Sequence, residues 1–274
     1  MRYGFITPNF GYCADARVLA DLAHQAEGAG WDGFFIWDHL QFGEVESGAD
    51  PWVALTAMAM RTEQIRLGPL VTPVPRRHIA KLARETATLD RLSNGRVILG
   101  AGAGSPRHAE YTAFGDEGDP KTRAAKLDEG LEVLTGLWSG KPVDHHGAHY
   151  RVECPGFEPP VQQPRIPVWI AATWPARKPL RRAARWDGVA PIVPNIHEGQ
   201  LIDPSDFCEL VGYIKEHRSS SEPFEVIQFG QTKEAGDTAT VGTYAEAGAT
   251  WWIDAARQTL EATRERLRKG PPRL

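Results

Sequence analysis

The residues best suited to proton chemistry follow a short apolar run. Residues 33–37 are glycine or apolar, and Asp38 and His39 come directly after them. A histidine exchanges protons near neutral pH, and a nearby carboxylate can orient its ring or take its proton. Glu110 is a second carboxylate that could reach this histidine in the folded chain. The three residues predict an acid–base site, and the structural alternatives are a hydrogen-bonded strand end and a solvated glutamate.

A second group of candidates could bind an anion. Thr173 and Trp174 follow the apolar run at 168–172, and Arg177 and Lys178 come next. A helix is expected to begin here, and the free N–H groups of a first helical turn attract phosphate. The two cationic side chains add to this attraction. This segment is the best phosphate-site candidate in the sequence, and its alternative is a solvated helix end.

Two further segments end in residues that suit a ligand. Thr72 closes the apolar run at 65–71, and its hydroxyl could bond a ligand heteroatom. Gly102, Ala103 and Gly104 follow the run at 97–99, but no helix opens directly after them, so the dinucleotide fingerprint is absent. The small residues predict a backbone wall against which a flat ring could lie. The alternative is a tight turn.

Composition and charge argue against several other classes. The 274 residues are 42% hydrophobic and 24% charged, and the formal net charge is −4 without a basic stripe. We therefore expect a globular protein that does not bind nucleic acid. No apolar run is as long as a membrane span, the first strand is broken too soon for a signal peptide, and the three cysteines are scattered. These features predict a cytoplasmic protein with reduced thiols.

A histidine-rich segment is not expected to bind metal. His145, His146 and His149 fall in a polar, alternating stretch at 143–152 that predicts a β-hairpin. Carboxylates and thiols do not stand near them at the usual ligand spacing. The predicted strand ends also lack the several carboxylates of a magnesium site. We expect no metal site.

These candidates must be positioned by a regular alternation of strands and helices. Apolar runs predict strands at 3–8, 33–37, 65–71, 97–99, 168–172, 188–190, 225–229 and 250–253. Helical periodicity, with capping residues and terminal glycines, predicts helices at 15–28, 51–62, 76–91, 124–137, 178–185, 205–217, 237–247 and 259–267.

Eight strands that alternate strictly with eight helices favour one architecture. We predict an α/β fold with a single (β/α)8 TIM barrel over residues 1–274, in which the hairpin is inserted between units four and five. A doubly wound open sheet is the alternative. In a barrel the active site lies at the carboxyl-terminal ends of the strands, which is where the candidate residues fall.

Four segments of the chain resemble the bacterial luciferase-like superfamily of flavin- and deazaflavin-dependent oxidoreductases. They are 30–39, which ends in Asp38-His39; 83–96 with 100–104 and 110–115; 147–150 with 160–170; and 182–188. Their order and spacing run from the N-terminus through the sixth unit. The last third diverges more, although 246–250 is similar to the family's entry into the eighth strand.

The resemblance implies a barrel that binds a flavin-type cofactor at its mouth, near strands one to four. Thr7, at the end of the first strand, joins the cofactor-binding candidates on this ground, and Thr72 would contact the ring. His39 matches a proton donor or cofactor contact of deazaflavin members, and Glu110 matches a carboxylate that some of them use. The resemblance also implies a non-prolyl cis peptide near residues 70–72, and a homodimer is common in the family.

The chain is shorter than typical flavin monooxygenases of the superfamily, which favours the compact deazaflavin branch. We therefore expect an oxidoreductase that uses coenzyme F420 for hydride transfer to or from a small organic substrate. One alternative is a monooxygenase that uses reduced FMN, supplied by a separate flavin reductase, together with O₂. An alternative of another class is a non-catalytic protein that binds a flavin or deazaflavin.

Overall fold

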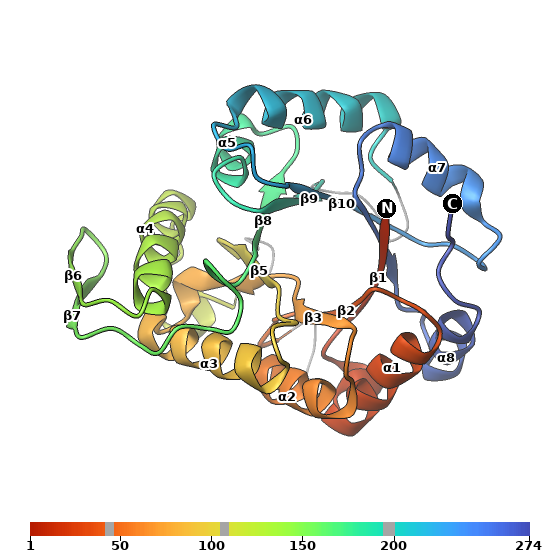
Figure 1. Ribbon diagram of the computed structural model, residues 1–274, viewed down its shortest axis with the longest axis horizontal. Coiled ribbons are helices and arrows are strands. Elements are labelled where there is room, and N and C mark those ends of the chain that lie inside the picture. The colour runs from red at the N-terminus through yellow and green to blue at the C-terminus, as the bar shows by residue number, and fades with distance from the viewer. Residues whose placement is uncertain (42–46, 105–109, 194–200) are drawn as a thin grey trace.

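The computed structural model describes residues 1–41, 47–104, 110–193 and 201–274. Parallel strands form a ring, and helices surround the ring on its outside (Figure 1). The ring contains β1 (Arg2–Thr7), β2 (Gly33–Ile36), β3 (Arg66–Pro69), β4 (Thr72–Pro73), β5 (Leu99–Gly102), β8 (Val168–Thr173), β9 (Gly188–Ile192), β10 (Glu225–Gly230) and β11 (Trp251–Ala255).

The predicted TIM barrel is confirmed, and it is nearly closed. The strand order is β3-β2-β1-β11-β10-β9-β8-β5-β4. The two end strands of this order, β3 and β4, are consecutive in the chain and form one barrel strand that is interrupted at residues 70 and 71. A single bridge between Leu67 and Val97 joins β3 to the segment before β5. The Leu70–Val71 peptide is cis, at the position that the family resemblance implied.

The helices are α1 (Ala16–Gly28), α2 (Pro51–Arg61), α3 (Ile79–Leu92), α4 (Pro120–Trp138), α5 (Arg177–Ala183), α6 (Pro204–His217), α7 (Thr238–Glu246) and α8 (Leu260–Arg268). The sequence explains how several of them begin. An aspartate side chain accepts a backbone N–H of the first turn in α1, α2, α4 and α6, and proline occupies the first turn of the last three.

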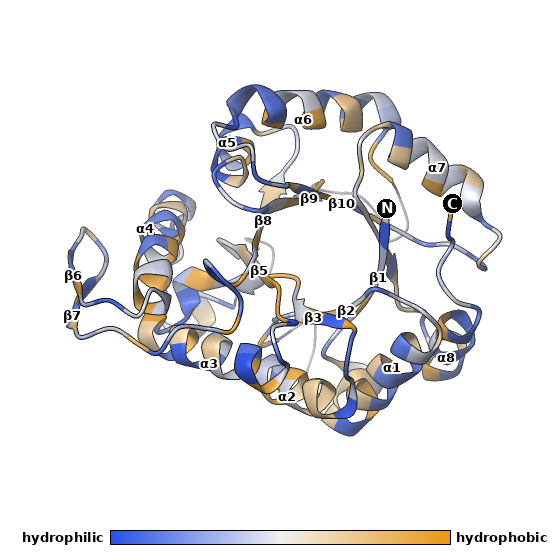
Figure 2. Ribbon diagram, in the orientation of Figure 1, coloured by the Kyte–Doolittle hydropathy of each residue, from blue (hydrophilic) through white to orange (hydrophobic). Residues whose placement is uncertain are grey.

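Two hydrophobic clusters hold the barrel together. The inner cluster fills the ring and contains Ile6, Phe35, Leu70, Ile98, Trp169, Ala190, Ile227, Trp251 and Ile253. The larger outer cluster packs the strands against the helices. Figure 2 shows the apolar residues gathered in the ring strands, whereas outer helices such as α6 carry polar residues as well. The filled interior leaves the barrel's two ends as places for ligands.

Several element boundaries differ from the sequence prediction. The predicted strand at 97–99 is instead β5, which runs on through Gly102. A Cβ at Gly100 would lie only 2.3 Å from the carbonyl oxygen of Pro69, so this glycine allows neighbouring strands to approach closely rather than making a loop. The helix predicted from residue 76 begins at Ile79, after a 3₁₀ turn at Val74–Arg76.

The predicted insertion is present as an antiparallel pair, β6 (Val143–His146) and β7 (Arg151–Cys154). Within the described residues, His, Cys, Asp and Glu side chains do not form a group of three that could hold a metal ion. Among the described helices, none combines the length and the apolar character that crossing a membrane requires.

Candidate active site

The acid–base candidates lie where β2 leaves the ring. After Ile36 the chain continues through Trp37 and Asp38 to His39, and its course is fixed by hydrogen bonds rather than by a helix. The side-chain amide of Asn9 donates to the carbonyl oxygens of His39 and Ala49, at 3.0 and 2.9 Å. Asn9 therefore holds the segment that carries His39, although sequence reasoning did not single it out.

The predicted pairing of His39 and Glu110 is present. Nδ1 of His39 lies 2.8 Å from Oε2 of Glu110, and the Glu110 side chain is only 4% exposed. The other carboxylate oxygen, Oε1, accepts the backbone N–H groups of Leu40 and Gln41. Because an ionised carboxylate is only an acceptor, this contact favours the tautomer with the proton on Nδ1. Nε2 then carries the lone pair that could accept a proton.

The surroundings of Glu110 keep it ionised. Burial alone would raise the pKa of Glu110, but hydrogen bonds from His39 and Gln41 and the charge of Arg76 lower that pKa to about 2. An ionised carboxylate beside the imidazole orients the ring through Nδ1. The pair is therefore suited to accept a proton on His39 while Glu110 stays charged.

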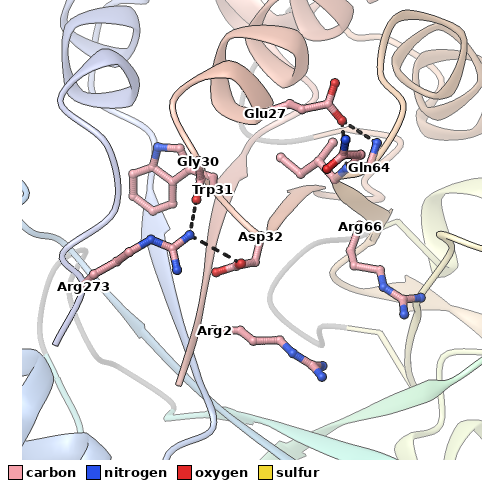
Figure 3. Close-up of a pocket in the computed structure, with 9 residues that line it drawn as sticks. Arg2, Glu27, Gly30, Trp31, Asp32, Gln64, Arg66 and Arg273 are labelled. Carbon is pink, nitrogen blue, oxygen red and sulfur yellow. Dashed lines mark hydrogen bonds and ion pairs between the residues drawn. The ribbon is translucent and has the colours of Figure 1, made fainter.

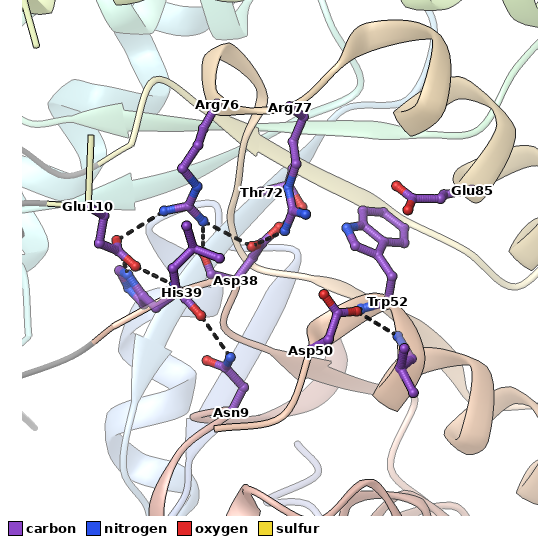
Figure 4. A network of polar contacts seen from close by, with 12 residues as sticks. Asn9, Asp38, His39, Asp50, Trp52, Thr72, Arg76, Arg77, Glu85 and Glu110 are labelled. Carbon is purple, nitrogen blue, oxygen red and sulfur yellow. Dashed lines mark hydrogen bonds and ion pairs between the residues drawn. The ribbon is translucent and has the colours of Figure 1, made fainter. Parts of the chain in front are cut away.

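Asp38 belongs to a second, fully buried part of the same network (Figure 4). The hydroxyl of Thr72 donates to Oδ2 at 2.8 Å. Arg76 lies 3.2 Å from Oδ1, and Arg77 contacts the same oxygen. Two arginines thus neutralise one buried carboxylate, as a buried charge requires. Thr72, predicted as a ligand contact, here uses its hydroxyl to hold Asp38.

Arg76 joins the two carboxylates and was missed in the sequence reasoning. Its side chain is 3% exposed, and Nη1 lies 3.3 Å from Oε2 of Glu110. This contact is an ion pair without hydrogen-bond alignment, so Nη1 still lacks an acceptor among the described residues. The sequence carries one indication of this role: Arg76 follows Thr72 by four residues, so it must lie near the same strand end.

The floor of the mouth is apolar. Trp37, Val71, Phe229 and Ala255 pack on the inner cluster and remain partly exposed. Each follows an inner-cluster residue by one or two positions, so all four lie toward the carboxyl-terminal ends of the strands. Ile192, at the end of β9, is 45% exposed. Partly exposed apolar side chains around the mouth would suit a flat, largely apolar ring.

The glycine segment has a different role from the predicted open wall. A Cβ at Gly102 would lie 3.0 Å from Val71 and 3.2 Å from Ala171. At Gly104, which has a φ of +78°, it would lie 2.4 Å from the Tyr111 hydroxyl. The protein's own side chains therefore occupy most of the space beside these glycines. Ala103 is partly exposed, and its carbonyl oxygen accepts the Tyr111 hydroxyl.

Two other predicted cofactor contacts have side chains in the protein interior. Thr7 is fully buried against Cys13. Trp174 is 5% exposed and belongs to the outer cluster between the strands and the helices. The indole ring of Trp174 could cover a ligand at the mouth only by leaving this packing. Thr173, by contrast, is exposed at the end of β8.

The predicted phosphate segment is partly engaged by the protein itself. Arg177 forms an ion pair with Glu209 of α6, and its guanidinium lies 4.5 Å from the centre of the Tyr213 ring. Lys178 is exposed. The residue before α5, Ala176, has no capping side chain, so the first-turn N–H groups are not satisfied by a cap. Phosphate binding by this backbone segment stays a prediction, and the Arg177 charge is shared with Glu209.

A buried arginine that sequence reasoning missed lies nearby. Arg123, in the first turn of α4, is 3% exposed and stacks 4.3 Å from the centre of the Tyr111 ring. In the part of the chain that the structure describes, it forms no ion pair, and its Nε lacks a hydrogen-bond partner. A buried guanidinium without a carboxylate is costly unless an anion joins it. Arg123 is therefore a stronger anion-site candidate than Arg177.

The fold and the site define a (β/α)8 barrel protein with an acid–base cluster at its mouth and a buried cation, Arg123, that forms no ion pair with the residues the structure describes. A family model described as luciferase-like monooxygenase matches residues 1–193. The chain belongs to this family, as its sequence motifs predicted.

A curated relative is the F420-dependent glucose-6-phosphate dehydrogenase of Amycolatopsis mediterranei (strain U-32). It is 35% identical over 174 residues, which are 60% of this chain and 52% of the relative. The chain therefore spans about half the length of the curated relatives that it matches.

Solved structures share the fold over most of the chain. An F420-dependent secondary alcohol dehydrogenase in complex with an F420-acetone adduct superposes with a TM-score of 0.80, at 16% identity, and covers 99% of this chain and 98% of that one. The oxygenating constituent of 3,6-diketocamphane monooxygenase from Pseudomonas putida, in complex with FMN, gives a TM-score of 0.67, at 18% identity, and covers 89% and 71%. At these identities the likeness concerns the fold.

Proposed function

We propose that this chain is an oxidoreductase that uses coenzyme F420 to oxidise or reduce a small organic substrate at the alcohol–carbonyl level. The observation that carries the proposal is the His39–Glu110 pair at the barrel mouth. The names of the curated relative and of the full-length structural neighbour, both F420-dependent dehydrogenases, support it. When bound, the coenzyme would accept or donate the hydride, which carries two electrons.

In the oxidation direction the protein must take the hydroxyl proton. Nε2 of His39 would accept that proton, and Glu110 would stabilise the resulting imidazolium through Nδ1. The unsatisfied Nη1 of Arg76 would donate to the substrate oxygen and orient it. In the reverse direction His39 would return the proton to the carbonyl oxygen.

The mouth has features that fit a deazaflavin. Trp37, Val71 and Phe229 form an apolar floor for a ring system. Arg123 would contact the phosphate of the cofactor side chain, together with the uncapped first turn of α5. Thr173, exposed beside that turn, is the predicted polar contact that best suits this arrangement.

Cofactor titration tests the proposal. Purified protein is titrated with F420 and with FMN, and bound cofactor is followed by fluorescence quenching. We expect F420 to bind and then to be reduced in the presence of members of a panel of small alcohols and sugar phosphates. Binding of reduced FMN but not of F420, with O₂ consumption, would favour the monooxygenase alternative. The structural neighbour in complex with FMN is such a monooxygenase. Tight F420 binding without hydride exchange would favour the non-catalytic binding protein.

We also propose that the chain forms a homodimer through α2. Val53 and Met60 are 64% and 71% exposed. They are seven positions apart, so they lie on the same face of the helix. Large apolar side chains that share an exposed face are typical of contact surfaces. Light scattering should show a dimer for the natural protein and a monomer for the double variant Val53→Glu, Met60→Glu.

A further inference from the structure

A cavity lies at the opposite end of the barrel from the acid–base cluster. It is open to solvent, has a volume of about 420 Å³ and is lined by Arg2, Glu27, Gly30, Trp31, Asp32, Gln64, Ile65, Arg66 and Arg273. Arg2 and Arg66 are the first residues of β1 and β3, so the cavity opens at the amino-terminal ends of the strands. Its volume is within the range of small-molecule sites.

The two carboxylates of this cavity are already engaged (Figure 3). Glu27 accepts the backbone N–H groups of residues 63, 64 and 65, with its shortest contact at 2.6 Å from Gln64. Asp32 accepts the Tyr3 N–H at 2.8 Å and lies 3.5 Å from Arg273. The lining of the cavity therefore contains three arginines and two carboxylates.

Arg66 is the arginine without a carboxylate partner. Its Nη1 donates to two neutral oxygens, those of the Gly95 carbonyl and the Gln162 side chain, at 3.1 and 2.9 Å. It forms no ion pair within the described part of the chain. Burial lowers the pKa of Arg66 and the positive charge of Arg2 lowers it further, whereas the charges of Asp90 and Glu225 raise it. An anion in the cavity would offset the repulsion between Arg66 and Arg2.

The other two arginines are placed to close on such an anion. Arg2 pairs with Glu225 at 2.9 Å through Nη1 alone, and Arg273 pairs with Asp32. Their side chains are 57% and 54% exposed, so both are long, solvated and able to reorient. The three arginines come from separate segments, which are β1, β3 and the residues after α8. This arrangement suits a tetrahedral oxyanion with several acceptor oxygens better than a single carboxylate.

We propose that the amino-terminal cavity binds a small organic phosphate through Arg66, with Arg2 and Arg273 as flanking contacts. The site is independent of the proposed oxidoreductase chemistry, because the strands separate it from the barrel mouth by about 15–20 Å. It would let the chain bind a phosphorylated metabolite at the face opposite to the active site.

Calorimetry with inorganic phosphate as the probe tests this inference. Phosphate is titrated into the natural protein in a chloride buffer of constant ionic strength, and the melting temperature is followed in parallel. We expect saturable binding and a rise in melting temperature, with the affinity about tenfold or more weaker in Arg66→Gln. Arg66→Lys should retain part of the affinity. Arg268→Gln, which removes an exposed arginine from α8 outside the cavity, should bind phosphate like the natural protein.

Two results would overturn the inference. One is the absence of saturable phosphate binding by the natural protein. The other is equal phosphate affinity in the natural protein and in a folded Arg66→Gln variant, with circular dichroism as the check of folding. Neither result depends on whether the barrel mouth binds F420.

Discussion

Asp38 and Asp254 are both fully buried, and each is neutralised by two arginines and one threonine hydroxyl. Asp38 follows the carboxyl-terminal end of β2, and Asp254 is the next-to-last residue of β11. A buried carboxylate is tolerated only with such partners, because an uncompensated charge costs several kcal/mol in the protein interior. The two clusters therefore have the same composition, and they differ in what else they contact.

The Asp254 cluster leads to backbone and packing contacts, and its second arginine, Arg257, is 21% exposed. Arg266 lies 3.0 Å from Asp254 and also donates to the carbonyl oxygens of Thr232 and Gly270. Its guanidinium stacks 4.9 Å from the centre of the Trp31 ring. Burial raises the pKa of Asp254, and the charge of Arg266 opposes this rise. The contacts tie β11 to α8 and to the segment after β10, which is a structural role.

The Asp38 cluster continues into a titratable pair. Arg76 contacts Asp38 on one side and Glu110 on the other, and Glu110 holds His39. His39 is the first residue of this chain of contacts that is partly exposed, with 23% of its side chain accessible. A buried aspartate–arginine cluster therefore indicates chemistry when it leads to a proton-exchanging group at the barrel mouth.

We expect the largest effect on the turnover rate from a substitution of His39, which the Asp38 cluster contacts through Arg76 and Glu110. His39→Ala should lower the turnover rate by about 10²–10⁴-fold, the usual contribution of a general acid or base. Its free energy of unfolding should fall only moderately, because buried Glu110 loses the hydrogen bond from His39 but keeps those from Leu40 and Gln41. His24→Ala, on the exposed side of α1, is the matched control and should keep the natural rate. Equal rates for the two variants would remove His39 from the mechanism.

A substitution in the Asp254 cluster should instead change the free energy of unfolding. Asp254→Asn should lower the free energy of unfolding by about 3–5 kcal/mol, because it leaves the buried Arg266 without its countercharge. The turnover rate of the folded fraction should be unchanged. Urea denaturation and a rate measured well below the melting temperature check both statements. A stable Asp254→Asn variant with a large loss of rate would mean that this cluster, too, serves the chemistry.

The stability that ionised Glu110 contributes should depend on pH. A carboxylate whose pKa is lowered from 4.5 to about 2 contributes stability above its unfolded pKa and loses that contribution as the pH falls toward 2. Glu110→Gln should therefore cost about 3 kcal/mol at pH 7, from the size of this shift. The difference from the natural protein should shrink below about pH 4.5. Denaturant titrations of both proteins at a series of pH values measure it, and a difference independent of pH would argue against an ionised Glu110.

We expect smaller effects on the turnover rate, compared with His39→Ala, from substitutions of two adjacent arginines, Arg76 and Arg77. Arg76 contacts both Asp38 and Glu110, whereas Arg77 contacts Asp38 alone among these carboxylates. Arg76→Lys should lower the rate by about 10–100-fold, which corresponds to the loss of one hydrogen bond to a charged group. Arg77→Lys should lower the rate less. Similar rates in the two variants would show that the Glu110 contact has no part in the reaction.

The sequence predicted the barrel well because alternation of apolar strands and capped helices repeats along the whole chain. It also predicted that Asp38, His39 and Glu110 would lie near one mouth, because the strand ends of a barrel meet there, whereas their catalytic role stays a prediction. It could not distinguish a glycine that admits a ligand from one that admits a neighbouring strand, as at Gly100. That distinction depends on contacts between residues far apart in sequence.

Arg76 and Arg123 were missed for a related reason. In the sequence, each is one of 31 basic residues, and basic residues are usually solvated. Their burial and the partners of their side chains appear only in the folded chain. The phosphate prediction at Arg177 failed to foresee Glu209, which lies on the next helix.

The most direct test of the account compares F420 binding and F420 reduction in the natural protein and in His39→Ala. F420 affinity is measured by fluorescence quenching, and reduction is followed by the loss of F420 absorbance with the alcohol and sugar phosphate panel. The account predicts that both proteins bind F420 with similar affinity and that only the natural protein reduces it at an appreciable rate. Binding of FMN without F420, or equal reduction by both proteins, would contradict it.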